Sequence, residues 1–288
     1  MRIGSVGTFT AAVAASLAAS LATSGAAFAQ VGQPADWQIS MQTPVTATAQ
    51  SMYSFHTALV WVITIITLFV GGLLLAVMLR FNERKNPTPS KTSHNTMIEV
   101  AWTVIPILIL VGIAIPSFRI LREQLIIPEP EVIVKATGHS WYWSYEYPTD
   151  QGGFVFDSLM LEDEEAAASG QPRLLAVDNE VVVPVNRVVK LQVTAADVLH
   201  AFALPSFGLK IDAVPGRLNE TWFKAEREGI YYGQCSELCG ARHAFMPIAI
   251  RVVSDAEYAA WLEEAQSRFA STEYGATRVA ATIEETAR

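Results

Sequence analysis

The chain has 288 residues, of which 51% are hydrophobic and 17% are charged, and its formal net charge is −8. The negative charge is concentrated in residues 131–253, which carry 16 acidic and 10 basic side chains. Because an acidic surface repels phosphate backbones, this balance excludes nucleic acid as a partner. The same charge fits attraction of a basic protein or plain solubility.

Residues 1–29 have the pattern of a secretory signal. They begin with the basic residue Arg2, continue through an alanine-rich apolar run and end in the small residues Ala26, Ala27 and Ala29. This pattern is typical of a segment that is removed after export. The alternative is a membrane anchor, but serine and threonine interrupt the apolar run. We therefore expect residues 30–53 to form an exported segment.

Two apolar runs, about residues 58–79 and 100–118, predict a transmembrane hairpin within residues 54–122. Each run has about the length that a helix needs to cross the hydrocarbon core. The connecting segment, residues 80–96, has one acidic residue, Glu83, against four basic residues, namely Arg80, Arg84, Lys85 and Lys91. The positive-inside rule places this segment in the cytoplasm, so both termini face outward.

Glu99 lies at the cytoplasmic start of the second span. Ionisable groups inside a membrane are rare and often mark ion or proton pathways. Near the interface, however, the same carboxylate can simply reach water. Position alone leaves both interpretations open.

Residues 123–253 have the pattern of a β-domain. Short runs rich in Val, Ile, Thr and aromatic residues, such as EVIVKATG, RVVKLQVTA and PIAIRVV, alternate with Gly, Pro, Asn and Asp. We expect an antiparallel sandwich or a Greek-key barrel of ordinary size. The acidic stretch 162–171 is interpreted as a surface loop. In residues 254–288, Ser254 and Glu257 form the capping pattern of a short helix, which a polar tail follows.

Both cysteines lie in one stretch, CSELCGARHAFM, which also contains His243 and Met246. Thiolate, imidazole and thioether ligands together favour copper, and a mononuclear blue-copper site uses a single cysteine. The pair Cys235 and Cys239 therefore suggests two metals that share the sulfur atoms. One alternative is a disulfide, which would close a very small ring and stabilise the fold little. Another is zinc, for which methionine is not a usual ligand.

Two coppers that share these sulfur atoms would need a further ligand. His200 is the candidate, because it lies in the loop-like stretch VLHAFALPSFG that follows the predicted strand RVVKLQVTA. An isolated histidine at a strand end is more often a packed residue. His139 fits less well, since it precedes the aromatic run WYWSYEY.

The metal loop, the stretch DVLHAF, the segment GHSWYWSYEYP and the two-span hairpin together resemble subunit II of the haem-copper cytochrome c oxidases, in the bacterial form similar to the mitochondrial subunit. The resemblance extends from the first span to residue 253. It implies a membrane-anchored all-β protein: a transmembrane helical hairpin, a cupredoxin-like Greek-key sandwich or barrel, and a short C-terminal helix. It also implies the bacterial inner membrane, with the β-domain on the periplasmic side.

By motif position, the resemblance implies a dinuclear mixed-valence copper centre, CuA. The implied copper ligands are two bridging thiolates, two terminal imidazoles and a weak thioether, namely Cys235, Cys239, His200, His243 and Met246. The backbone carbonyl of Glu237 matches the weak ligand of the other copper. The side chain of Glu237 matches a contact to magnesium or manganese at the junction with subunit I.

The resemblance also implies a path for electrons. Trp141 matches the tryptophan that accepts electrons from cytochrome c, and four acids match its docking carboxylates, namely Glu146, Asp157, Asp178 and Asp197. Trp143 is expected in the core, because alternate residues of a strand face opposite sides. Glu99 matches the mouth of a proton channel into subunit I. Ser140 is a departure, since many relatives have Gln at this position, and we expect altered hydrogen bonds there.

The function that we expect is transfer of electrons from cytochrome c through CuA to a haem in subunit I, within a proton-translocating oxidase that contains further subunits. No C-x-x-C-H motif for covalent haem occurs, so the donor is expected to be a separate protein. Two alternatives remain. A quinol oxidase subunit would share the membrane anchor but lack the copper ligands. An anchored copper-binding or copper-delivery protein would belong to no oxidase.

Overall fold

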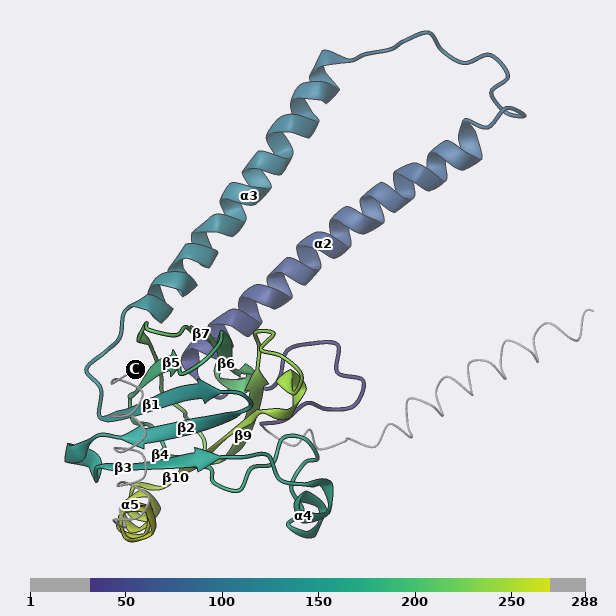
Figure 1. Ribbon diagram of the computed structural model, residues 1–288. Helices are drawn as coiled ribbons and strands as arrows, with labels where there is room; N and C mark the ends of the chain where they lie inside the picture. The colour runs from purple at the N-terminus through teal and green to yellow at the C-terminus, as the bar shows by residue number, and fades with distance from the viewer. Residues whose placement is uncertain (1–31, 270–288) are drawn as a thin grey trace, which may run out of the picture.

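The structure, a computed structural model, describes residues 32–269. The expected signal segment 1–29 and the expected polar tail from residue 270 lie outside this range. Within it, two long helices rise from the same side of a β-domain, and a loop joins their far ends (Figure 1).

Helix α2 spans Ala47–Arg80 and helix α3 spans Thr96–Leu125. Each begins at a polar cap. The side chain of Thr46 accepts a hydrogen bond from the first turn of α2, and that of Asn95 accepts two from the first turn of α3. These bonds satisfy backbone donors that have no partner inside a helix. Helix α2 therefore begins before residue 54, where we expected the hairpin to start.

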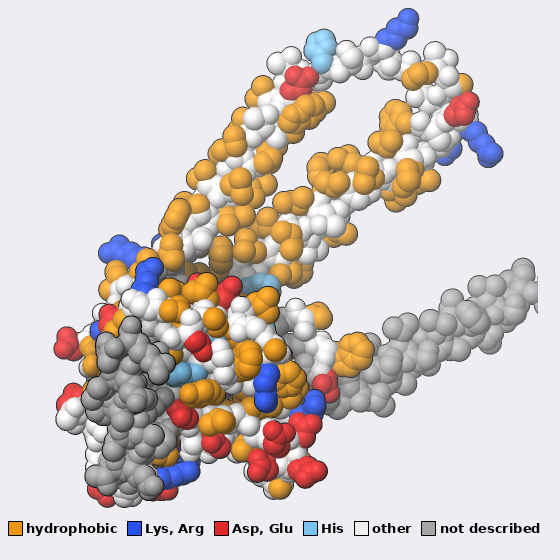
Figure 2. All heavy atoms as spheres, in the orientation of Figure 1, with side chains coloured by type: hydrophobic (Ala, Val, Ile, Leu, Met, Phe, Trp, Pro, Cys, Tyr) orange, Lys and Arg blue, Asp and Glu red, His pale blue; other side chains and the backbone are white. Residues whose placement is uncertain are grey.

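Both helices are long and apolar enough to cross a membrane. In the part of the chain that the structure describes, no residue in the most apolar window of either helix is buried, and apolar side chains cover their visible face (Figure 2). A helix that is apolar on all sides requires apolar surroundings. The predicted pair of membrane helices is confirmed, and α3 continues through Pro106 and Pro116.

The β-domain consists of two five-stranded sheets. The first has the order β3-β2-β1-β5-β8, with strands at Phe154–Ser158, Tyr142–Tyr147, Val132–His139, Val189–Ala195 and Asn219–Phe223. The second has the order β4-β10-β9-β6-β7, with strands at Val181–Pro184, Pro247–Val253, Gly229–Cys235, His200–Leu204 and Leu209–Ala213. Three short 3-10 turns complete the domain, at Thr149–Gln151, Pro205–Phe207 and His243–Phe245.

The predicted sandwich is confirmed, but the expectation of purely antiparallel pairing is wrong in two places. Strand β1 pairs in parallel with β5, and β10 pairs in parallel with β4. A parallel pair needs a long crossover connection. Here the chain leaves the first sheet after β3, forms β4 in the second sheet and then returns beside β1.

An aromatic core fills the space between the sheets, and its fully buried side chains include Trp143, Tyr145, Tyr147, Phe154, Phe156 and Phe202. Trp143 has no exposed surface, as predicted, and its ring lies edge-on to Phe202 at 5.2 Å between centroids. Burial of each such side chain stabilises the fold by roughly 1.5–3 kcal/mol. The core thus gives the neighbouring loops a rigid base.

Helix α5, Asp255–Phe269, closes the open end of this core. The predicted cap is confirmed: Ser254 Oγ accepts from the backbone N–H of Glu257, whose carboxylate accepts from the backbone N–H of Ser254. Trp261 packs against Tyr147 at 5.2 Å between ring centroids, so the apolar face of α5 covers the aromatic core.

The acidic stretch 162–171 is not the loop that we expected, because Asp163–Ala168 forms the short helix α4. Acidic residues are favourable in a first helical turn, and Glu162 and Glu165 form a capping box. Ala166 is buried. The capping pattern at Glu162 and Glu165 indicates the start of a helix, but we interpreted the acidic stretch as a loop because of its high charge.

Candidate metal centre

The candidate metal ligands come from two neighbouring strands of one sheet. Cys235 is the last residue of β9, and the loop to β10 carries Cys239, His243 and Met246. His200 is the first residue of β6, which pairs antiparallel with β9. We expected His200 in a loop, but it is a strand residue. Its place beside Cys235 is therefore fixed by strand pairing.

The sulfur and nitrogen atoms of these residues converge. Sγ of Cys235 lies 3.8 Å from Sγ of Cys239 and 3.9 Å from Nδ1 of His200. Sγ of Cys239 lies 3.5 Å from both Nδ1 of His243 and Sδ of Met246. The carbonyl oxygen of Glu237 lies 3.3 Å from Sγ of Cys235. The six sequence-predicted copper ligands thus occupy one place in the fold.

These separations suit ligands around a metal. Two atoms bound tetrahedrally to one metal, at about 2.3 Å for sulfur and about 2.0 Å for nitrogen, lie roughly 3.5–3.8 Å apart. A disulfide needs about 2.05 Å between sulfur atoms, whereas the two thiols are 3.8 Å apart and free. The donor set therefore fits soft metal ions and not a disulfide.

The site is shielded from water on most sides. His200 has no exposed surface, Met246 has 1%, and the two cysteines have 6% and 7%. His243 is half-buried. The site can therefore be reached from the His243 side, while the other ligands are enclosed by the core.

The two thiols differ in acidity. Burial disfavours the thiolate of Cys235, but hydrogen bonds, first of all with His200, lower its pKa nonetheless. Burial, together with repulsion from Cys235, raises the pKa of Cys239 to about 12. Two thiolates this close repel each other, and a bound cation would remove that repulsion.

Asp197 orients the His200 ring. Its Oδ1 lies 2.9 Å from Nε2 of His200, and its Oδ2 accepts a 2.7 Å bond from the backbone N–H of Ser140. Partial burial opposes ionisation of Asp197, but these bonds hold its pKa well below the ordinary value. Because Nε2 is engaged, Nδ1 is left facing Cys235, an arrangement common for metal-bound histidine.

Trp141 contacts the metal loop directly. It lies in the turn between β1 and β2 and is half-buried. Its indole Nε1 donates a 3.1 Å hydrogen bond to the carbonyl oxygen of Cys239. Gly240 permits this contact, since a Cβ there would lie 3.0 Å from Cζ2 of Trp141. The backbone N–H of Ser140 donates a bond to Asp197, and the altered hydrogen bonding expected at this residue stays a prediction.

The four sequence-predicted docking acids occupy different surroundings. Glu146 pairs with Lys135 at 2.8 Å. Asp157 accepts a hydrogen bond from Ser144. Asp178 is exposed, although partial desolvation raises the pKa of its carboxyl, and it accepts a bond from the backbone N–H of Leu159. Asp197 contacts His200 of the metal site, so the four are not equivalent surface charges, and their docking role stays a prediction.

Glu99 lies in the first turn of α3, and that end of the helix is far from the β-domain (Figure 1). Its Oε1 accepts a 3.2 Å bond from the backbone N–H of Asn95. Glu237, by contrast, is at the site, and its side chain is exposed.

Two features of the site were missed. A Cβ on Gly138 of β1 would lie 2.8 Å from Cδ2 of His200, so only glycine leaves room for the ring. A glycine inside a strand pattern often marks such a close approach. The D-x-x-H spacing of Asp197 and His200 likewise suggested a carboxylate–histidine pair, but we assigned Asp197 to docking.

Comparison with known proteins gives matches that all point to one protein family. The family model for the periplasmic domain of cytochrome c oxidase subunit II matches residues 132–253, and that for its transmembrane domain matches residues 34–120. A probable cytochrome c oxidase subunit 2 from Rickettsia bellii is 52% identical over 235 residues, which is 82% of this chain and 87% of the relative. Cytochrome c oxidase subunit 2 of Cereibacter sphaeroides is 44% identical over 253 residues, with 82% and 83% covered.

One solved structure is also similar in sequence. The crystal structure of the periplasmic domain of subunit II of cytochrome oxidase of Bradyrhizobium japonicum is 64% identical, and the match covers 50% of this chain and 99% of that one, with a TM-score of 0.47.

Proposed function

Because this chain belongs to the family of cytochrome c oxidase subunit II, we propose that it accepts electrons from cytochrome c at a dinuclear copper centre and passes them to a haem in subunit I. As a member of this family it is a copper-binding subunit of a haem-copper oxidase complex and a membrane protein with an extracellular domain. We assign it to the bacterial inner membrane with the β-domain in the periplasm. A copper-delivery protein outside any oxidase is not favoured, since the curated relatives are oxidase subunits along 82% of the chain.

The observation that carries the dinuclear proposal is the pairing of the ligands. Cys235 faces Nδ1 of His200 and the carbonyl of Glu237, whereas Cys239 faces Nδ1 of His243 and Sδ of Met246. The two thiols thus lie between two histidines and two weak ligands. Since the two sulfur atoms are 3.8 Å apart, both can serve two metals at once. A mononuclear site built from one cysteine, two histidines and a methionine would leave the second thiol and the Glu237 carbonyl unused.

When bound, such a copper pair takes up and releases one electron. The protein keeps the ligands in place during this change, because β6 and β9 hold His200 and Cys235 at one edge. The backbone N–H of Cys235 donates to the carbonyl of Met246, which closes the loop, and that of Ser236 donates to the carbonyl of Ala201, which ties the loop to β6. Ligands supported in this way move little, which suits a one-electron carrier.

We propose Trp141 as the residue that receives electrons from the donor. It is half-buried at the surface and bonded to Cys239. A flat aromatic ring suits contact with a haem edge. Glu146, Asp157 and Asp178 would orient a basic cytochrome c and raise its rate of association.

Two acids remain proposals that rest on family resemblance. The exposed side chain of Glu237 would contact magnesium or manganese at the junction with subunit I, since carboxylates suit these hard cations. Glu99 would lie at the mouth of a proton channel. Its place at the cytoplasmic end of a membrane helix is compatible with that role.

Electron paramagnetic resonance of the copper-loaded oxidase tests the dinuclear proposal. One unpaired electron shared by two coppers gives a hyperfine pattern from two equivalent nuclei, and the site should also absorb in the near infrared. Cys239→Ser should convert this spectrum to that of separate single coppers, because it removes one bridge. A single-copper spectrum in the unmodified protein would disprove the proposal.

A further inference from the structure

A groove lies where the two helices meet the β-domain. Its volume is about 510 Å³, and its lining comes from the start of α2, the end of α3 and Trp222 of β8. The helix residues that line it include the hydroxyl-bearing Thr48 and Ser51 and the basic Arg119 and Arg122. Figure 2 shows basic side chains where α3 approaches the domain.

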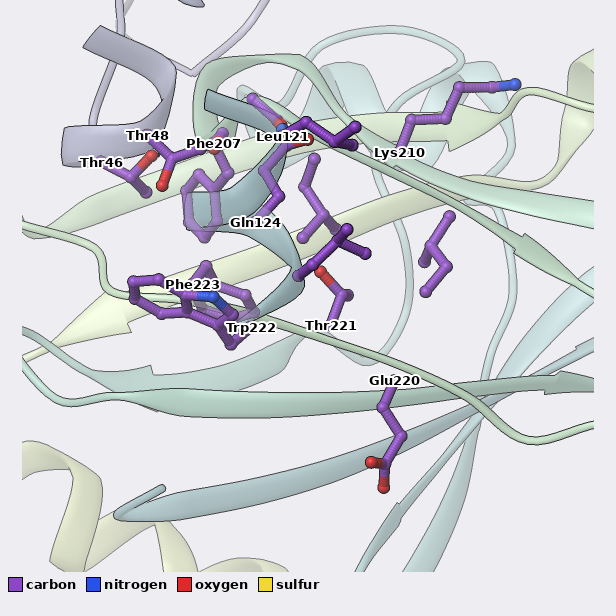
Figure 3. Close-up of a pocket in the computed structure, with 14 residues that line it drawn as sticks. Thr46, Thr48, Leu121, Gln124, Phe207, Lys210, Glu220, Thr221, Trp222 and Phe223 are labelled. Atoms are coloured by element: carbon purple, nitrogen blue, oxygen red, sulfur yellow. Dashed lines mark hydrogen bonds between the residues drawn. The ribbon is translucent and has the colours of Figure 1, made fainter. Parts of the chain in front are cut away.

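A smaller cavity of about 210 Å³ continues the groove, because Thr48 and Trp222 line both. Figure 3 shows Trp222 and Phe223 side by side at one edge of this cavity, while the charged ends of Lys210 and Glu220 point away from it. The continuation is therefore lined by both polar and apolar groups, with the two aromatic rings at one edge.

The groove lies at the outer headgroup layer of the bilayer. Between Glu99 and Arg119, residues 100–118 contain no charged side chain. A helix of this length rises by about 28 Å, which is close to the thickness of the hydrocarbon core. If Glu99 lies at the cytoplasmic face, Arg119 reaches the opposite headgroups. Trp222 suits the same depth, since tryptophan is enriched at membrane interfaces.

The two arginines lie on one side of α3, because residues three apart are neighbours on a helix. Within residues 32–269, no ion pair involves either guanidinium, and both are exposed. Glu123 is the one acid among the residues that line the larger groove. Its carbonyl oxygen accepts a 3.2 Å bond from Nε1 of Trp222, which ties β8 to α3. The groove lining is therefore net positive.

The helix dipole explains part of this arrangement of basic residues. Basic residues near a helix C-terminus interact favourably with the helix dipole, and Arg122 lies in the last turn of α3. Arg119 lies before that turn, and the dipole does not account for an apolar groove beside both residues.

We propose that this groove binds an anionic phospholipid of the outer leaflet. The guanidinium groups of Arg119 and Arg122 contact the phosphate, with the hydroxyls of Thr48 and Ser51 as further donors. The lipid's glycerol and first methylenes lie against Trp222. The occupant is a lipid and not a free anion, because the groove opens beside membrane helices and is largely apolar. This proposal does not depend on the copper centre.

The test measures phospholipid bound to the purified oxidase complex by mass spectrometry after lipid extraction. The double variant Arg119→Gln with Arg122→Gln should lose bound anionic lipid, and its affinity for added phosphatidylglycerol should fall about thirtyfold. Arg84→Gln with Lys85→Gln is the matched control, since it removes the same charge from the loop between the helices. It should retain the lipid.

A second variant, Ser51→Leu, fills the groove without removing charge and should also expel the lipid. Unchanged lipid content in both groove variants would overturn the proposal. Equal competition by inorganic phosphate would show an anion site without lipid specificity, which also overturns it. Dissociation of the double variant from the oxidase would assign the groove to a subunit contact instead.

Discussion

The indole Nε1 of Trp141 donates a 3.1 Å hydrogen bond to the backbone carbonyl oxygen of Cys239. The ring that we propose as the acceptor of electrons is thereby joined to the backbone of a proposed copper ligand. Trp141 thus belongs to the metal site, although it lies in a different turn of the chain.

Trp141→Phe keeps an aromatic ring but removes this hydrogen bond. We expect electron transfer from reduced cytochrome c to slow by about tenfold, which corresponds to about 1.4 kcal/mol of activation free energy. The dissociation constant should change little. Stopped-flow measurements give both quantities, with Trp37→Phe as a control, since Trp37 is 97% exposed in the segment before α2. Equal losses of rate and affinity would point to docking alone.

Asp178→Asn should slow association with cytochrome c without disturbing the fold, since the amide oxygen can still accept the bond from Leu159. We expect a decrease of about twofold to fivefold at low ionic strength and a flatter salt dependence. Burial raises the pKa of Asp178. Lowering the pH through that pKa should therefore remove the difference between variant and parent. Glu263→Gln, on α5, is the charge-matched control, and an unchanged salt slope for Asp178→Asn would exclude a docking role.

Asp197→Asn tests whether this acid acts through His200. Removing the carboxylate that orients a metal-bound histidine typically weakens metal binding by about 10–100-fold. We expect that loss in copper titrations, with a changed copper spectrum. Asp178→Asn should leave the spectrum intact. If Asp197→Asn altered only the association rate of cytochrome c, the acid would belong to docking after all.

Gly138→Ala should displace the His200 ring, because the added Cβ would lie 2.8 Å from Cδ2 and 3.0 Å from Cγ. Such overpacking costs about 1–3 kcal/mol. We expect a lower melting temperature of the metal-free protein and less bound copper per chain. Full copper occupancy with unchanged melting would show that the ring has room to shift.

Arg187 joins the first sheet to the start of α5. Its guanidinium lies 2.6 Å from the carboxylate of Glu131 and 2.7 Å from that of Asp255. Hydrogen bonds from Arg187 lower the pKa of both acids below their ordinary values of 4.5 and 3.8. The stabilisation is therefore complete at neutral pH and is lost as the pH falls through the lowered pKa values.

Arg187→Gln should consequently melt at a lower temperature than the parent at pH 7, and the difference should shrink below about pH 4. Calorimetry across this pH range provides the measurement. A difference that grows at acid pH would have the wrong sign for this ion pair.

Local sequence pattern predicted the membrane helices, the capped helix α5 and the loop of soft ligands, because each depends on residues close together in the chain. The same reasoning failed for the parallel pairs β1–β5 and β4–β10, since parallel pairing depends on crossovers between the sheets. It also failed for α4, because we gave the high charge of this segment more weight than its capping pattern.

Within the site, the convergence of the candidate ligands could be predicted from the sequence, whereas the contacts that support these residues could not. His200 and Cys235 are far apart in sequence, and only the pairing of β6 with β9 brings them together. The room that Gly138 leaves for the ring depends on the opposite sheet. Contacts of this kind arise from the packed domain and have no local pattern.

The position of His200 within a strand means that one side of the site belongs to the sheet itself. Once β6 and β9 pair, His200 and Cys235 are neighbours whether or not a metal has arrived. The donors of Cys239, His243 and Met246 follow from closure of one loop. The site is therefore built partly from the sheet and partly from a loop, and the half-buried His243 belongs to the loop.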